Sequence, residues 1–183
     1  MGIFEELGRI EAGFAHRPHH SRSPGAVEEY LAGQGYPNLE VAEVMEFERN
    51  FYAIAGEPDT GVGAMGLLEH EDAGAVGPEM GPNMMWNARY GMHGRGAMMG
   101  GGSETNAIVP DEAVEIALRW LDANRASVSA EEDADAFYGH YTIHTLEDGD
   151  IEGMLSVHGT TGQVWYHTWH GPFIQMIEEG EAH

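Results

Sequence analysis

The stretch GPNMMWNARYGMHGRGAMMGGG, residues 81–102, divides this chain into two parts. Its glycines are too frequent for a regular helix or strand, and its methionines are too frequent for an ordinary linker. The segments on either side of it resemble each other. The sequence therefore predicts two similar units, 25–80 and 109–183, joined by a Gly/Met-rich connector over 81–108. An N-terminal amphipathic helix and linker are expected over 1–24.

Each unit is expected to begin with a helix and to continue as antiparallel strands. Pro24 and Pro110 stand at favoured first positions of a helix, and the second helix should end near Asn124. The strands are expected at 39–47, 51–55, 63–68, 136–146, 151–158 and 163–169, followed by a helical turn over 172–179. The predicted fold class is α+β, with each unit a helix packed on a short antiparallel meander. The two units are expected to share one core, because a unit of about 65 residues buries little surface alone.

The composition excludes several classes of protein. The chain has 31 acidic residues against 8 arginines and no lysine, so binding to nucleic acid or to an anionic membrane is disfavoured. This negative charge has two interpretations. It forms an acidic coat suited to a salty medium, or it attracts cations or a basic partner. There is no cysteine, which excludes disulfides and thiolate metal sites. No apolar run reaches the ~18 residues of a membrane span, and no signal peptide is recognisable.

A repeated motif accompanies the two units. Residues 67–76 read LLEHEDAGAV and residues 155–164 read LSVHGTTGQV, as expected for a duplicated supersecondary unit. The second copy resembles the PepSY domain, with a helix introduced by Pro110-Asp111-Glu112-Ala113 and a hairpin that ends in the TGQVWY run of 161–166. The first copy is degenerate, because Ala73 replaces the threonine and Gly77 the aromatic residue. The resemblance implies a small non-catalytic module of the cell envelope or of protease propeptides, and it supplies no catalytic residues.

The connector offers soft metal ligands. Met92, His93, Met98 and Met99 are candidate ligands for copper, because thioether sulfur selects Cu(I) and imidazole accepts both oxidation states. A solvated loop is the alternative for this segment. Residues 84–86 read MMW beside a proline, and we expect them to form an apolar plug between two sheets.

Histidines of the second unit are the other candidate ligands. His140 and His144 share one face of a strand, but about 13 Å separates positions i and i+4, so they cannot bind one ion together. A cross-strand set of His144, His158 and His167 is the predicted alternative. Histidines that simply line a polar face are the competing interpretation.

Two apolar surfaces are candidate partner-binding sites. One is the stripe of the N-terminal helix and the other is the aromatic C-terminal region; their residues are Phe4, Leu7, Ile10 and Phe14, and Trp165 and Trp169. No nucleophile elbow, P-loop or dinucleotide motif is present, so no enzyme is predicted. The first functional hypothesis is an accessory subunit with a protein partner or a second copy. A copper-binding envelope protein and a propeptide-type protease inhibitor or chaperone are the alternatives.

Overall fold

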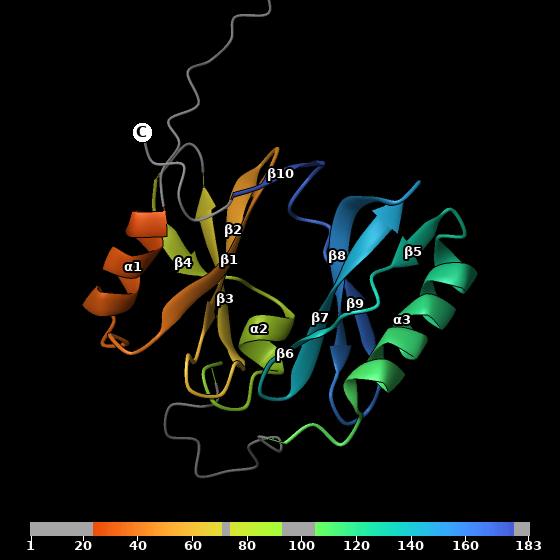
Figure 1. The fold of residues 1–183 in the computed structure, drawn as a ribbon, viewed down its shortest axis with the longest axis horizontal. Helices are drawn as coiled ribbons and strands as arrows, with labels where there is room; N and C mark the ends of the chain where they lie inside the picture. Colours follow the sequence, from red (N-terminus) through yellow and green to blue (C-terminus); the bar gives the residue numbers. More distant parts are fainter. Residues whose placement is uncertain (1–23, 71–73, 93–104, 178–183) are drawn as a thin grey trace, which may run out of the picture.

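Two antiparallel sheets face each other, and a helix covers the outer side of each (Figure 1). The computed structural model describes residues 24–70, 74–92 and 105–177. The first sheet has the order β10-β1-β2-β3-β4, and the second has the order β5-β7-β8-β9 with β6 paired to β7. The bounds of the first group of elements are α1 Pro24–Gly33, β1 Glu40–Phe47, β2 Asn50–Gly56, β3 Gly63–His70, β4 Val76–Pro78 and α2 Pro82–Met85. Those of the second are α3 Pro110–Asn124, β5 Val128–Ala130, β6 Asp135–Ala136, β7 His140–Glu147, β8 Asp150–His158, β9 Val164–Tyr166 and β10 Phe173–Met176.

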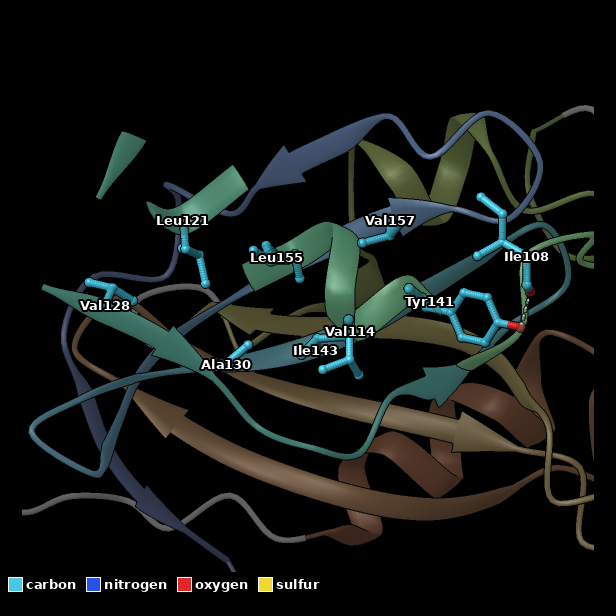
Figure 2. Packing of buried hydrophobic residues seen from close by; sticks show 11 residues of the cluster. Ile108, Val114, Leu121, Val128, Ala130, Tyr141, Ile143, Leu155 and Val157 are labelled. Carbon is cyan, nitrogen blue, oxygen red and sulfur yellow. Dashed lines mark hydrogen bonds between the residues drawn. The ribbon is translucent and has the colours of Figure 1, made fainter. Parts of the chain in front are cut away.

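Helix α3 forms for reasons that lie within its own sequence. Pro110 occupies the first turn with two acidic residues, where proline and negative charge both favour helix initiation. Its buried positions are Ala113, Val114, Ala117 and Leu121, which recur at helical spacing. Figure 2 shows this face packed on residues of β5, β7 and β8, with the Tyr141 hydroxyl donating to the Ile108 carbonyl at 2.7 Å.

The layer between the sheets combines apolar and polar side chains. From the first sheet, Phe47, Tyr52 and Ile54 belong to a buried cluster that also includes Met154 of β8 and Phe137, which directly follows β6. The inner face of the second sheet also carries buried polar residues, which are His140, Thr142, His144 and Ser156. Strict alternation along β7 produces this arrangement, because its apolar residues face α3 and its polar residues face the other sheet.

The predicted fold class is wrong. Strands dominate the described residues, which contain ten strands and three helices, and the molecule is mostly β. The structure does not consist of two helix-on-meander units with one shared core, because its buried apolar residues form three clusters. The first sheet also contains β10, so residues 25–80 do not complete it. Local patterning predicted most of the strands, but the pairing of sheet edges depends on distant segments.

The C-terminal helical turn predicted over 172–179 is also wrong. Phe173–Met176 is strand β10, and it pairs antiparallel with β1 through Met45 opposite Met176 and Phe47 opposite Phe173. The edge of β1 has backbone donors and acceptors that need partners, and this segment supplies them. A short apolar run cannot be assigned to helix or strand from its periodicity alone.

The described part of the connector contains helix α2, which lies between the sheets but does not form the expected methionine plug. Helix α2 sits at one end of the inter-sheet layer (Figure 1), and Pro82 and Asn83 are its buried residues, whereas Met85 is 60% exposed. The Asn83 amide accepts from the Gly66 N–H at 2.9 Å and donates to the Gly66 carbonyl at 3.1 Å. Backbone groups of β3 require polar partners here, and a methionine side chain cannot provide them.

Candidate metal centre

Three metal-ligating side chains meet in the layer between the sheets. The Glu79 Oε1 atom lies 3.2 Å from Nδ1 of His167 and 3.1 Å from Nε2 of His170. The two imidazole nitrogens lie 3.4 Å apart. All three side chains are at most 2% exposed. The grouping, here called the Glu79 centre, could hold a metal ion.

Backbone hydrogen bonds place the Glu79 carboxylate. Glu79 directly follows β4, and its N–H donates to the Gly66 carbonyl of β3 at 2.9 Å. A Cβ atom on Gly66 would lie 2.8 Å from Glu79 Oε2, so the carboxylate uses space that only glycine leaves at this position.

The two histidines of the Glu79 centre come from one short segment. His167 directly follows β9, and its N–H donates to the Met154 carbonyl at 3.0 Å, which extends the pairing with β8 by one residue. The His170 carbonyl accepts from the Arg49 N–H at 3.2 Å. Trp169, between them, stacks on the His167 ring at 4.5 Å and donates its indole N–H to Glu79 at 3.1 Å.

The proton on His170 is assigned by its neighbour Asn50. The Asn50 amide nitrogen donates to the Trp169 carbonyl at 3.3 Å, so its oxygen faces His170 Nδ1 at 2.8 Å. An amide oxygen only accepts, and Nδ1 must therefore carry a proton. Burial lowers the pKa of His170, against the opposing effect of Glu79, which favours the neutral ring. Neutral His170 then directs the lone pair of Nε2 at a carboxylate oxygen, and a cation between the two atoms would remove this conflict.

His167 is held by a chain of hydroxyl groups. Its Nε2 atom lies 2.9 Å from Ser156 Oγ, which lies 3.2 Å from Thr142 Oγ1. Burial raises the pKa of the neighbouring Glu79 carboxyl, but positive charge on His167 and His170 outweighs that effect and lowers the pKa to about 2. A divalent cation would supply this positive charge with both rings neutral. Outer hydrogen bonds of this kind fix the orientation of metal-binding histidines.

Among the described residues, Nδ1 of His140 has no hydrogen-bond partner, and the Tyr52 hydroxyl has only the Thr142 side chain beside it. Both side chains are 1% exposed. Tyr52 meets the His170 ring edge-on at 5.4 Å, and its hydroxyl, like Glu79 Oε2, would lie close to a Cβ on Gly66. Burial lowers the pKa of His140 to about 3, so its ring is neutral. Buried polar atoms without partners are typical of places that hold water or an ion.

The distances among Glu79 Oε1, His167 Nδ1 and His170 Nε2 match those of three ligands on one face of a metal ion. An ion about 2.1 Å from each of the three atoms would make ligand–metal–ligand angles of roughly 100°, between the octahedral and tetrahedral values. Two imidazoles and one carboxylate are a donor set for Zn²⁺ and for Fe²⁺.

Ser156, His167 and Glu79 also stand in the order of a serine hydrolase triad. Ser156 is fully buried, and Thr142 shares its hydroxyl in a hydrogen bond. A nucleophile must reach its substrate, and a buried serine cannot. Ser156 therefore orients the His167 imidazole by a hydrogen bond rather than acting as the nucleophile of an acyl transfer.

A second grouping lies at another place between the sheets. Glu43 of β1, Asp135 of β6 and His144 of β7 could also hold a metal ion. His144 contacts a carboxylate at each ring nitrogen, Glu43 at 3.1 Å and Glu131 at 2.9 Å. Burial opposes its charge, but these carboxylates raise the pKa of His144 to about 9. Burial and the Glu43 carboxylate raise the pKa of Asp135 to about 6.

The predicted histidine set is not brought together. His144 belongs to the second grouping and His167 to the Glu79 centre. His158 lies opposite His140, and its Nδ1 accepts from the N–H groups of Thr160 and Thr161 at 3.1 and 3.2 Å. The register of β7 on β8 decides this separation, because it places Met154 rather than a histidine opposite His144.

The other predicted site residues are only partly within the described chain. Met92 is 66% exposed, and His93, Met98 and Met99 lie outside the described residues, so the copper site stays a prediction. The N-terminal stripe of Phe4, Leu7, Ile10 and Phe14 also lies outside them. Trp165 is half-buried and packs edge-on against Trp86 at 5.6 Å, and Trp169 is half-buried against the Glu79 centre.

Sequence reasoning missed the carboxylates of both groupings. The HTWH run of 167–170 was a usable signal, because it places two histidines three residues apart. Glu79 is one of 31 acidic residues, and nothing local distinguishes it. The same holds for Glu43 and Asp135.

Comparisons with family models, with curated proteins and with solved structures return no match for this sequence. Among the described residues, no helix has the length and apolar character that crossing a membrane requires.

Proposed function

We propose that this protein binds a divalent transition-metal ion at the Glu79 centre, with Zn²⁺ as the best match and Fe²⁺ as the ion that the same donor set also serves. The observation that carries the proposal is the closeness of three ligand atoms, none more than 3.4 Å from another. Metal-ligand distances of about 2.1 Å require this spacing.

The charges of the Glu79 centre support the same conclusion. Glu79 is fully buried, and its carboxylate needs positive charge beside it. The Asn50 contact places the His170 proton on Nδ1, and burial favours the neutral ring, so a bound cation would supply that charge. Buried charges in proteins are paired or bind metal ions. A divalent cation would be shared by both histidines and the carboxylate, and the outer contacts to Asn50 and Ser156 would hold the rings in place.

The proposed role of the ion is to join parts of the fold rather than to catalyse a reaction. Glu79 follows β4 of the first sheet, whereas His167 and His170 lie between β9 and β10. An ion bound to all three would fasten the C-terminal crossover between the sheets. The ligand side chains are at most 2% exposed, which is too buried for a substrate. The segment that carries His167 and His170 borders a hollow of about 510 Å³. A protein partner stays a prediction.

A metal titration tests the proposal. After chelator treatment, Zn²⁺ would be titrated into the protein in competition with a chromophoric chelator. We expect Glu79→Gln and His170→Gln each to remove one tight equivalent of Zn²⁺, with a loss of affinity beyond the roughly 10–100-fold typical of outer contacts. His158→Gln is the matched control, because it removes a histidine of the same sheet that lies outside the centre.

Circular dichroism of each variant would establish that it folds. Retention of every tight equivalent by folded Glu79→Gln and His170→Gln proteins would refute the proposal, and so would an equal loss in His158→Gln. Co²⁺ gives a second measurement, because the intensity of its visible absorption reports the number of ligands.

A further inference from the structure

The grouping of Glu43, Asp135 and His144 has the features of a site distinct from the Glu79 centre. One ligand atom from each residue lies within 4.8 Å of the others, and His144 Nε2 lies 3.1 Å from Glu43 Oε1. The residues come from β1 of one sheet and from β6 and β7 of the other. The grouping therefore forms only when the two sheets pack together.

The backbone directs each of these side chains to one place. The pairing of β1 with β2 shifts register between Val41 and Glu43, and such bulges re-aim side chains. Asp135 is fixed opposite Thr142 by the pairing of β6 with β7. His144 lies on the inner face of β7, two residues beyond Thr142, and is 7% exposed.

Glu131 orients the histidine without joining the set. Its N–H donates to the His144 carbonyl at 3.0 Å, and its carboxylate contacts His144 Nδ1 at 2.9 Å. A carboxylate on one ring nitrogen, with the other nitrogen left to the ion, is the outer arrangement that accompanies metal-binding histidines. Nε2 faces Glu43, so it is the nitrogen that would bind a cation, with release of the proton that it otherwise donates to Glu43.

The surroundings are open to water, unlike those of the Glu79 centre. Glu43 and Asp135 line a hollow of about 240 Å³, which Ile54, Glu57 and Gly63 also border. An ion bound here could keep water molecules as further ligands. Two carboxylates, one imidazole and water are a set that suits Mn²⁺, since oxygen ligands and octahedral geometry favour this ion.

We propose that Glu43, Asp135 and His144 form a second metal site, which binds a divalent cation of the Mn²⁺ type at the solvent-accessible side of the inter-sheet layer. The site is independent of the Glu79 centre in its residues and in its hollow. Its donor set is richer in oxygen, so the two sites should prefer different ions.

Manganese binding tests this proposal. Free Mn²⁺ in a titration of the chelator-treated protein would be measured by electron paramagnetic resonance. We expect Asp135→Asn and Glu43→Gln each to weaken Mn²⁺ binding at least about tenfold. Asp133→Asn is the control, because it removes the same charge two residues away from Asp135 and outside the grouping, and it should change the affinity less than about twofold.

The outcomes separate this site from the Glu79 centre. Glu79→Gln should leave Mn²⁺ binding at the second site intact, and this result would hold even if the Glu79 centre bound no metal. Equal weakening by Asp135→Asn and Asp133→Asn would mean general attraction to an acidic surface and would overturn the proposal. An absence of saturable Mn²⁺ binding by the unmodified protein would overturn it as well.

Discussion

Replacement of His144 by glutamine should lower the stability of the metal-free protein in a pH-dependent way. The ring contacts Glu43 and Glu131 through its two nitrogens, and its side chain is 8% exposed. Protonated His144 therefore makes two charge-assisted hydrogen bonds, and the one to Glu43 links β1 of the first sheet to β7 of the second. Glutamine preserves some polar contact but carries no charge.

The magnitude follows from the pKa of His144. It is about 9 in the folded protein against 6.5 for an ordinary histidine, because the two carboxylates outweigh burial. Each pKa unit corresponds to about 1.4 kcal/mol, so the charge contributes about 3 kcal/mol at most and about 2.5 kcal/mol at pH 7. Since the folded pKa is the higher one, this contribution is complete below pH ~6.5 and disappears as the pH rises through ~9.

Urea unfolding between pH 6 and pH 9.5 would measure the effect in the presence of a chelator. We expect His144→Gln to be about 2–3 kcal/mol less stable than the unmodified protein at pH 7, with a melting temperature lower by about 5–10 °C. The two proteins should converge near pH 9.5. The chain has no lysine, and unfolded tyrosines ionise near pH ~10, so few groups other than the α-amino group titrate between pH ~8 and pH 9.5. The other ten of the 11 histidines titrate near pH ~6.5 in both unfolded proteins, so the comparison between the two proteins isolates His144.

Two results would refute this reasoning. One is the same pH dependence in both proteins between pH 7 and pH 9.5, which would mean that His144 carries no extra proton in the folded state. The other is a stability of His144→Gln equal to that of the unmodified protein at pH 7. Glu131→Gln should reproduce part of the effect, since it removes one of the two carboxylates.

Three further predictions concern the sheets and the proposed sites. Asp135→Asn should stabilise the metal-free protein by about 1 kcal/mol at pH 7 after allowance for solvent screening, because the pKa of Asp135 is raised to about 6, and urea unfolding should show no gain below pH ~4. Gly63→Ala should cost about 1–3 kcal/mol in thermal unfolding, since the new Cβ would lie 2.7 Å from the Phe137 ring. Zn²⁺ at about 100 times its dissociation constant should raise the free energy of unfolding by about 2.7 kcal/mol, and calorimetry should find no such gain in Glu79→Gln.

Elements whose causes are local were predictable from the sequence. The spacing of apolar residues, an initial proline and acidic residues in the first turn predicted α3 at Pro110–Asn124, and the structure confirms it. Alternation and the Asp148-Gly149 pair predicted the hairpin of β7 and β8. Both turn residues have positive φ, 54° and 92°, as a two-residue loop of this kind requires. These features depend on contacts within a few residues.

The fold class and the candidate sites depend on distant contacts. Nothing within 173–176 identifies β1 as its partner, so its apolar residues alone predict a helical turn where the structure has a strand. His167 and His170 were visible as neighbours, but Glu79 reaches them only because β4 lies at the edge of one sheet and the two sheets pack face to face.

Helix α3, most of the strands, the hairpin of β7 and β8 and the polar face of β7 follow from local sequence, because neighbouring residues settle each of these. The pairing of sheet edges and the meeting of carboxylates with histidines follow from the folded arrangement of the whole chain. Those outcomes depend on packing between segments far apart in the chain, which no local pattern of residues records.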